Sequence, residues 1–247
     1  MKNYIFLLIA AVTVAGCTKD LKTYDGKPVV YFQYATETAA GRALTDSTII
    51  SFAYSAVTRT DSIIALPIKV TGLSAATNRT YQLVVAPAST ATSKHYEFVN
   101  TDFTIGAGKY LDTVYIKLHR TTDMLSSTFV ILLNLQANEN FGVDVQSKLV
   151  TSSTAVSTII QTIKVNDILK QPKYWLDYYL GPFSRKKLYL MSDILGITID
   201  KLDVSASVAE LVFYGKFMQR YLNEQKAAGT PILEDDGTPM TMGPGSI

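Results

Sequence analysis

Hydrophobic and polar residues alternate along the middle of the chain, from Pro28 to about Asp167. The alternation has a period of two, which is typical of strands that bury one face. In one stretch, Leu66, Ile68 and Val70 share a face. The pattern predicts eight strands, at residues 29–34, 48–57, 63–71, 80–86, 96–105, 111–118, 128–137 and 156–165.

Turn residues such as Thr71-Gly72 and residues 106–108 separate the predicted strands. The segments between the strands show no helical period. This arrangement indicates a mainly β protein with an antiparallel, immunoglobulin-like β-sandwich of two sheets. The chain has no Cys…Trp…Cys triplet, so it is not an antibody-type domain. We expect the β-sandwich domain to cover residues 28–170.

A small α-helical region is predicted over residues 171–247. Ser184 can cap a short helix over residues 185–195, which Gly196 ends. Ser207 followed by Glu210 forms a capping-box signature for a longer helix over residues 208–228. The apolar stripe of that helix has spacings of three and four: Leu211, Tyr214, Met218 and Tyr221.

The last part of the chain contains turn chemistry. An Asp236-Gly237 pair lies within residues 232–240 and predicts a short terminal hairpin. Residues 243–245 read Gly-Pro-Gly, and we expect them to be loose.

The N-terminus has the composition of a signal peptide. Lys2 precedes an apolar run at residues 4–12, which is too short to span a bilayer. The following Val14-Ala15-Gly16-Cys17 resembles a bacterial lipobox. The resemblance implies a signal peptide over residues 1–16, cleavage before Cys17, and fatty acyl chains such as palmitate on this cysteine. Residues 17–27 would then link a membrane anchor to the sandwich, whereas the alternative is a plain secretory signal.

Composition limits the remaining chemistry. The chain has 247 residues, 47% of them hydrophobic and 18% charged, so it can build a packed core and is not a disordered protein. A formal net charge of +2 argues against a nucleic-acid partner. One cysteine cannot form an intrachain disulfide, and two histidines exclude a multi-His metal site.

No set of residues in the sequence points to catalysis. His95 and His119 are the two imidazoles, and neither accompanies a nucleophile elbow or a His-Glu-x-x-His motif. We therefore expect no enzyme activity, no catalytic residue and no cofactor.

Four acidic residues lie near predicted strand ends: Glu97, Asp123, Glu139 and Asp144. Solvated turn acids are the expected interpretation, and we predict no metal site. A calcium ion held by converging loops is the alternative, because calcium takes oxygen ligands.

Aromatic residues gather in a six-residue stretch that contains Tyr174, Trp175, Tyr178 and Tyr179. Flat rings can stack on sugars. They can also attach the helical region to the sandwich, and helical spacing would place pairs 174/178 and 175/179 on adjacent faces. We expect Trp175 in the core and take Tyr178 and Tyr179 as candidate glycan-binding residues.

An ordered series of short segments resembles a known family. It includes Leu66-Pro67-Ile68-Lys69-Val70, Ile105-Gly106-Ala107-Gly108, Pro172-Lys173-Tyr174-Trp175 and Leu180-Gly181-Pro182-Phe183-Ser184. Together they resemble an uncharacterised domain-of-unknown-function family of Bacteroidota outer-membrane lipoproteins. Such proteins are often encoded near starch-utilisation-type glycan-uptake systems. The succession of residues 89–91, 95–96 and 106–108 also resembles Calx-beta domains. The resemblance implies no catalytic or binding residue.

These observations lead to one functional expectation and one alternative. The chain would be a lipid-anchored, non-enzymatic accessory protein of the outer membrane, on the cell surface or on the periplasmic face. It would bind a glycan or a protein partner near a nutrient-uptake complex, such as an outer-membrane transporter. The alternative is a structural adhesion or envelope-assembly module without a small-molecule ligand.

Overall fold

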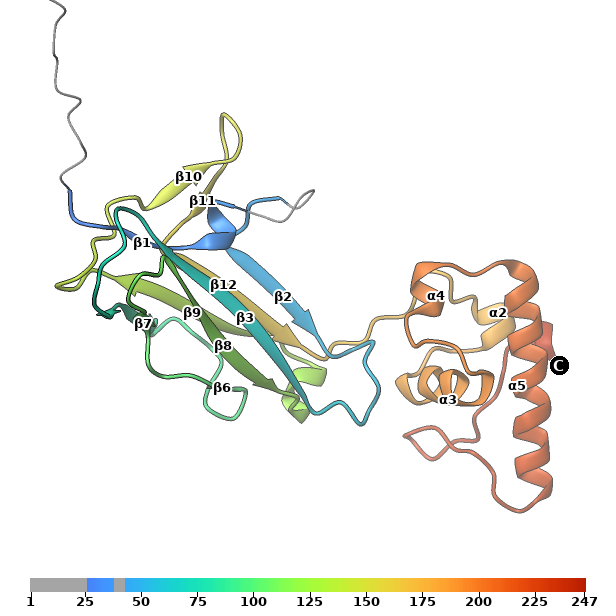
Figure 1. Cartoon of the computed structure of the whole chain (residues 1–247). Helices are drawn as coiled ribbons and strands as arrows, with labels where there is room; N and C mark the ends of the chain where they lie inside the picture. Colours follow the sequence, from blue (N-terminus) through green and yellow to red (C-terminus); the bar gives the residue numbers. More distant parts are fainter. Residues whose placement is uncertain (1–25, 38–42) are drawn as a thin grey trace, which may run out of the picture.

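The fold is taken from a computed structural model that describes residues 26–37 and 43–247. The predicted signal peptide, Cys17 and most of the predicted linker lie outside the described residues. The described chain forms two regions side by side, a β-sandwich followed by a helical unit (Figure 1). The fold is mainly β with a helical C-terminal region, as the sequence predicts.

The first sheet of the sandwich is antiparallel and has the order β1-β3-β8-β6. Its strands are β1 (Val30–Phe32), β3 (Asp61–Val70), β8 (Leu111–His119) and β6 (Tyr96–Phe98). The central pair β3 and β8 is in register from Asp61 opposite His119 to Lys69 opposite Leu111. Alternate side chains of these strands face the second sheet, because successive residues of a strand point to opposite faces.

The second sheet is mixed and has the order β2-β12-β9-β5. Its strands are β2 (Ser47–Ser51), β12 (Ile160–Asn166), β9 (Phe129–Gln136) and β5 (Gln82–Val85). Strand β2 pairs with β12 in parallel, whereas the other pairs are antiparallel. The prediction of an antiparallel sandwich therefore misses one parallel pair at the sheet edge.

Several predicted strands are shorter or divided in the structure. Strand β2 ends at Ser51, and the chain turns toward the helical unit instead of continuing to residue 57. Residues 96–105 contain two short strands, β6 and β7 (Thr104–Ile105), and β7 pairs with β4 (Arg79–Thr80). The pair β10 (Ser147–Leu149) and β11 (Ala155–Ser157) forms a hairpin whose first strand the sequence pattern does not predict.

The two regions have separate hydrophobic cores. The sandwich core includes Val114, Ile116 and Leu118 from β8, and Ile131 and Leu133 from β9, all fully buried. A second core has its buried residues between 175 and 242, all in the helical unit. Burial of these apolar surfaces is the main favourable term for each region.

The helical unit contains α2 (Asp177–Leu180), α3 (Arg185–Leu195), α4 (Lys201–Val204) and α5 (Val208–Ala227). The caps predicted for α3 are confirmed: Ser184 accepts from the Lys187 N–H, and Gly196 adopts φ +65°. The predicted capping box of Ser207 and Glu210 at the start of α5 is confirmed too. No helix in the described part of the chain has the length and apolar character that crossing a bilayer requires.

The C-terminal tail is ordered against the helices. An isolated bridge between Leu233 and Pro239 closes the predicted hairpin around Gly237. The expectation that residues 243–245 are loose is wrong, because the 3-10 helix η3 (Pro244–Ser246) packs on α2 and α5. Glycine permits this approach: a Cβ on Gly215 would lie 1.9 Å from the Ser246 Oγ. The Ser246 hydroxyl donates to the Tyr179 carbonyl at 2.8 Å.

Candidate functional site

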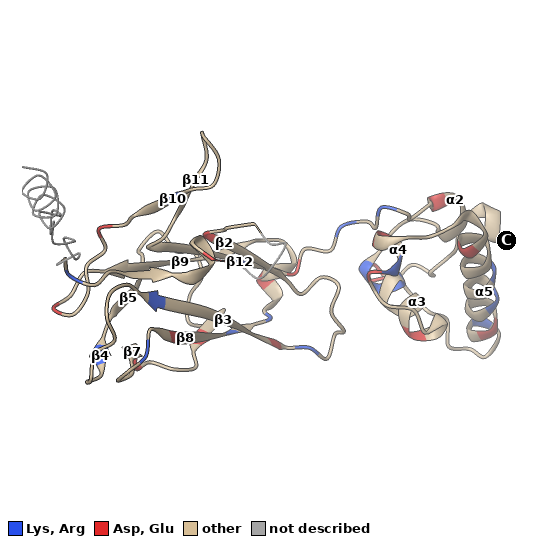
Figure 2. Ribbon diagram, turned by 45° about the horizontal axis from the view of Figure 1, so that its top comes forward, with Lys and Arg blue, Asp and Glu red and all other residues tan. Residues whose placement is uncertain are grey.

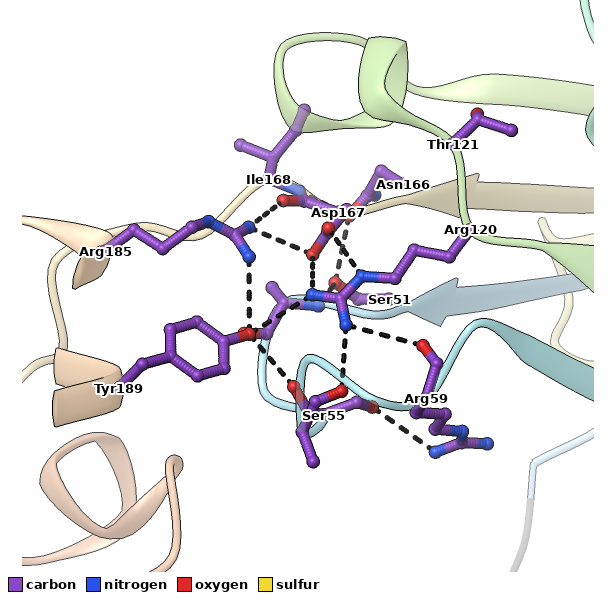
Figure 3. Close-up of polar contacts among 12 residues, drawn as sticks. Ser51, Ser55, Arg59, Arg120, Thr121, Asn166, Asp167, Ile168, Arg185 and Tyr189 are labelled. Carbon is purple, nitrogen blue, oxygen red and sulfur yellow. Dashed lines mark hydrogen bonds and ion pairs between the residues drawn. The ribbon is translucent and has the colours of Figure 1, made fainter. Parts of the chain in front are cut away.

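The junction between the two regions is built around the carboxylate of Asp167, which follows β12 and is 2% exposed. Arg120 of the sandwich donates to both of its oxygens, at 2.8 and 3.1 Å. Arg185, at the start of α3, donates to the same carboxylate at 3.0 Å (Figure 3). One buried carboxylate thus joins a cation from each region.

The hydroxyl of Tyr189 from α3 completes the junction (Figure 3). It donates to the carbonyls of Ala53 and Ser55, at 3.1 and 2.9 Å. The same oxygen accepts from Arg120 at 3.2 Å and from Arg185 at 3.3 Å. The hydrogen bonds to Asp167 and Tyr189 raise the pKa of Arg120 despite its desolvation, so it stays charged. These contacts fix the orientation of α3 relative to the sandwich.

A cleft of about 460 Å³ lies in the helical unit between the start of α3 and the terminal hairpin. Residues 182–184 and Lys187 line one side, and residues 234–236, 238, 239 and 241 line the other. The ring of Phe183 and two prolines supply apolar surface, while hydroxyls and carboxylates supply polar groups. The lining is therefore more polar than that of a typical small-molecule pocket.

A buried ion pair joins the two sides of this cleft. The Lys187 side chain is 2% exposed, and its Nζ lies 3.6 Å from the Glu234 carboxylate and donates to the Pro182 carbonyl at 2.8 Å. Burial lowers the pKa of Lys187, and the charge of Glu234 opposes this shift. The hydroxyl of Ser184 donates to Glu234 at 2.6 Å. The pair therefore holds the hairpin against α3, and both of its residues line the cleft.

Two acidic residues at the tip of the hairpin remain at the rim. Asp235 is highly exposed and lies 4.0 Å from the Lys186 ammonium. Asp236 accepts from the backbone N–H and the hydroxyl of Thr238, and these hydrogen bonds lower its pKa. Both carboxylates can accept hydrogen bonds from a ligand, and their negative charge disfavours anionic ligands.

The predicted aromatic residues have different environments. Trp175 is 3% exposed, and its indole donates to the Gly181 carbonyl at 2.9 Å, which confirms its expected place in the core. It contacts the cleft residue Phe183 edge to face, with ring centroids 5.1 Å apart. The predicted helical pairs 174/178 and 175/179 do not form, because α2 begins only at Asp177.

The candidate glycan residues Tyr178 and Tyr179 lie on α2, against the C-terminal segment. Tyr178 is 61% exposed, whereas Tyr179 is partly buried and packs against the helical core. Their rings meet at 80° with centroids 5.0 Å apart. The two rings therefore form no common flat platform, although the exposed face of Tyr178 is open to a ligand.

Both histidines take part in local sandwich contacts. His95 is 1% exposed, stacks on Phe129, and lies 3.2 Å from the Asp123 carboxylate. His119 lies 2.7 Å from the Asp61 carboxylate. Neither histidine contacts a serine or cysteine nucleophile in the hydrogen bonds of the described chain.

Two of the four acidic residues considered for calcium, Asp123 and Glu97, pair with lysines. Asp123 also pairs with Lys94, and hydrogen bonds from Lys94 and Thr121 lower its pKa. Glu97 lies 3.4 Å from the Lys117 ammonium instead. Among residues 26–37 and 43–247, no three His, Cys, Asp or Glu side chains gather as metal ligands.

Sequence reasoning missed the junction and the cleft. The basic run at residues 185–187 was the available signal, since Arg185 binds Asp167 and Lys187 binds Glu234. Its acidic partners are 18 residues upstream and 47 residues downstream, and spacing alone does not pair residues so far apart.

A comparison with protein families identifies the chain's relatives. A model described as a domain of unknown function (DUF4843) matches residues 24–197. The match covers more than half of the chain, so the protein belongs to this family. No curated protein matches the chain.

Solved structures give similar proteins at low identity. Two proteins of unknown function from Bacteroides ovatus align with TM-scores of 0.37 and 0.35 at 15% and 18% identity. Each alignment covers 56% of this chain and less than half of the other, at 44% and 46%. A family 123 glycoside hydrolase from Clostridium perfringens aligns with a TM-score of 0.28 at 8% identity, over 82% of this chain and 36% of that one. The family match confirms the predicted resemblance to an uncharacterised domain-of-unknown-function family.

Proposed function

We propose that this member of the DUF4843 family is a lipid-anchored, non-enzymatic accessory protein of the outer membrane. It binds a glycan in the cleft between α3 and the terminal hairpin, near a nutrient-uptake complex. The observation that carries the proposal is the lining of that cleft, where residues with hydroxyls and carboxylates lie together with the aromatic ring of Phe183.

The chemistry of the lining fits a polyhydroxylated ligand. Sugar hydroxyls are donors and acceptors, and the carboxylates of Asp235 and Asp236 offer acceptors at the rim. The apolar faces of sugar rings match the surface of Phe183, Pro182 and Pro239. Because Glu234 already neutralises Lys187, the two aspartates leave the cleft acidic. We therefore expect a neutral or amino-bearing glycan.

The resemblance of residues 14–17 to a lipobox and the layout of the chain support the proposed location. The first described residues lie at the end of the sandwich away from the helical unit (Figures 1 and 2). An acyl group on Cys17 would hold that end near the membrane and leave the helical unit farther from it. Dual acylation suffices for stable anchoring without a membrane-spanning helix.

Glycan-array binding tests the ligand. Wild-type protein should bind neutral or amino-bearing glycans, and Asp235→Ala should weaken this binding about tenfold because a rim acceptor is lost. Asp193→Ala is the matched control, since this exposed aspartate lies in the second half of α3, outside the cleft. Equal binding by wild type and Asp235→Ala, or no glycan bound at all, would refute the cleft assignment.

Metabolic labelling with a palmitate analogue tests the anchor. Wild-type protein should carry label and fractionate with the outer membrane, whereas Cys17→Ser should lose the label and enter the soluble fraction. Membrane retention of the unlabelled variant would show that another element holds the protein there.

A further inference from the structure

The helix α5 has apolar residues on two faces. Leu211, Tyr214, Met218 and Leu222 are buried in the helical core. Phe213 lies on another face and is 58% exposed. A single exposed apolar residue is ordinary on a protein surface, whereas a continuous apolar patch is informative, so the neighbours of Phe213 decide its meaning.

Phe213 belongs to a small continuous surface, which we call the α5 outer face and define as Phe213, Lys216, Phe217 and Arg220. These four side chains line a hollow of about 350 Å³. The two phenylalanine rings lie 5.9 Å apart, and the Arg220 guanidinium covers Phe217 at 5.0 Å. Lys216 and Arg220 also line an adjacent hollow of about 420 Å³, whose lining includes Ile247.

The charge of this face is positive. Residues 211–223 of the helix contain Lys216 and Arg220 and no acidic residue. Glu224 lies 3.6 Å from Arg220, but both side chains are well exposed and such pairs are weak. Lys216 takes part in no salt bridge among the described residues. The face therefore combines two aromatic rings with a net positive charge, because Lys216 has no acidic partner in the described chain.

The position of α5 makes this face available to other molecules. The helix forms the side of the helical unit farthest from the sandwich (Figures 1 and 2). The 3-10 helix η3 packs against α5 near Gly215, and Phe213 stays open.

We infer that the α5 outer face docks a protein segment that carries an apolar anchor flanked by acidic residues. Aromatic and arginine side chains dominate the binding energy of protein interfaces, and this face presents both. Acidic residues in the partner would pair with Lys216 and Arg220. The inference is independent of the glycan cleft, because the two sites share no lining residue.

Other occupants fit the observations less well. The two rings are inclined by 47° and one is half-buried, so they offer no flat platform for a sugar. A second copy docked symmetrically would bring the same two cations against each other. These occupants are outcomes of the test below.

Site-specific photo-crosslinking tests the inference in the full-length protein in its native cells. p-Benzoylphenylalanine replaces Phe213, and the crosslinked peptides are identified by mass spectrometry. We expect adducts to a segment of another protein that carries net negative charge and an apolar residue. The same probe at Leu73, which is 87% exposed in the sandwich, measures the background.

A charge reversal provides the second readout. Lys216→Glu combined with Arg220→Glu should lower the adduct yield at position 213 about tenfold and leave the yield at position 73 unchanged. Both side chains are exposed, so circular dichroism should show an unchanged fold. The inference would be overturned by adducts to a second copy, to lipid or glycan, or to proteins that are also captured at position 73. It would also be overturned if the charge reversal left the adduct yield at position 213 unchanged.

Discussion

The sandwich and the helical unit use their polar and aromatic side chains in different ways. In the sandwich, the groups that first suggest chemistry are engaged locally: His119 contacts Asp61, and His95 stacks on Phe129. In the helical unit, a cleft opens beside a buried lysine, and Phe213 and Tyr178 remain exposed. From this difference we propose that the sandwich is a scaffold and that the helical unit carries the recognition surfaces.

The junction explains how the two regions work as one molecule while keeping separate cores. Asp167 and Tyr189 connect them through directed hydrogen bonds, and Tyr54 and Leu169 add apolar contact with the helical core. Polar junctions of this kind fix orientation through their geometry more than through net stability. The comparison therefore predicts that a substitution that destabilises one region leaves the stability of the other region largely unchanged.

The largest effect is expected from Trp175→Ala. This change removes a buried aromatic side chain and its hydrogen bond to Gly181, so it should destabilise the helical unit by about 3–5 kcal/mol. Hydrogen exchange measured by mass spectrometry at increasing urea should show early opening of residues 175–247 and unchanged protection in β8 and β9. Equal loss of protection in both regions would show that they form one cooperative unit. Tyr178→Ala, at an exposed position, is the control.

Asp167→Ala should have an intermediate effect. It leaves Arg120 and Arg185 side by side without their shared carboxylate. Breaking a buried pair costs about 3–5 kcal/mol, and the partial exposure of Arg185 reduces this to about 2–3 kcal/mol. Spin labels at exposed positions 109 and 226 should show a broader distance distribution than in wild type. Asp61→Ala breaks an exposed pair in the sandwich and should leave that distribution unchanged.

The smallest effect concerns acid stability. Hydrogen bonds from Ser207 and the ion pair with Lys201 lower the pKa of Glu210 from 4.5 to about 2. A lowered carboxyl pKa stabilises the fold above about pH 4.5, and this contribution is lost as the pH falls toward 2. Glu210→Gln should flatten that part of the pH profile. Urea unfolding followed by fluorescence of Trp175, the chain's one tryptophan, reports the helical unit directly.

A control glutamate makes this last prediction specific. Glu224→Gln changes an exposed residue of the same helix that has no capping role. It should leave the acid slope as in wild type. An unchanged slope in Glu210→Gln would mean that the capping carboxylate contributes no measurable stability to the helical unit.

The fold was predictable where local patterns decide it. Alternation placed the long central strands, and capping residues such as Ser184 and Ser207 marked helix starts to the residue, because these signals act within a few positions. The parallel pairing of β2 with β12 was not predictable, since it joins segments more than 100 residues apart. The packed C-terminal segment was missed because Gly-Pro-Gly also describes a loose tail, and only the surface of α2 and α5 selects the packed form.

The candidate site was less predictable than the fold. The burial of Trp175 followed from its size and its position at the start of the helical region. The partners of Asp167 depend on how α3 meets the sandwich, and the partner of Lys187 depends on how the tail folds back on α3. No local signal encodes either arrangement. The exposure of Phe213 opposes the usual burial of aromatic residues, and the helical period alone places it on an outer face.

Fluorescence titration with an array-positive glycan tests most directly whether the helical unit is the recognition region. Trp175 contacts Phe183, whose ring lines the cleft, so a ligand there should change the tryptophan emission. We predict a saturable change in wild type and in Asp193→Ala, with the midpoint about tenfold higher in Asp235→Ala. A glycan that binds with no change in emission, and that protects sandwich strands from hydrogen exchange instead, would contradict the division between scaffold and recognition unit.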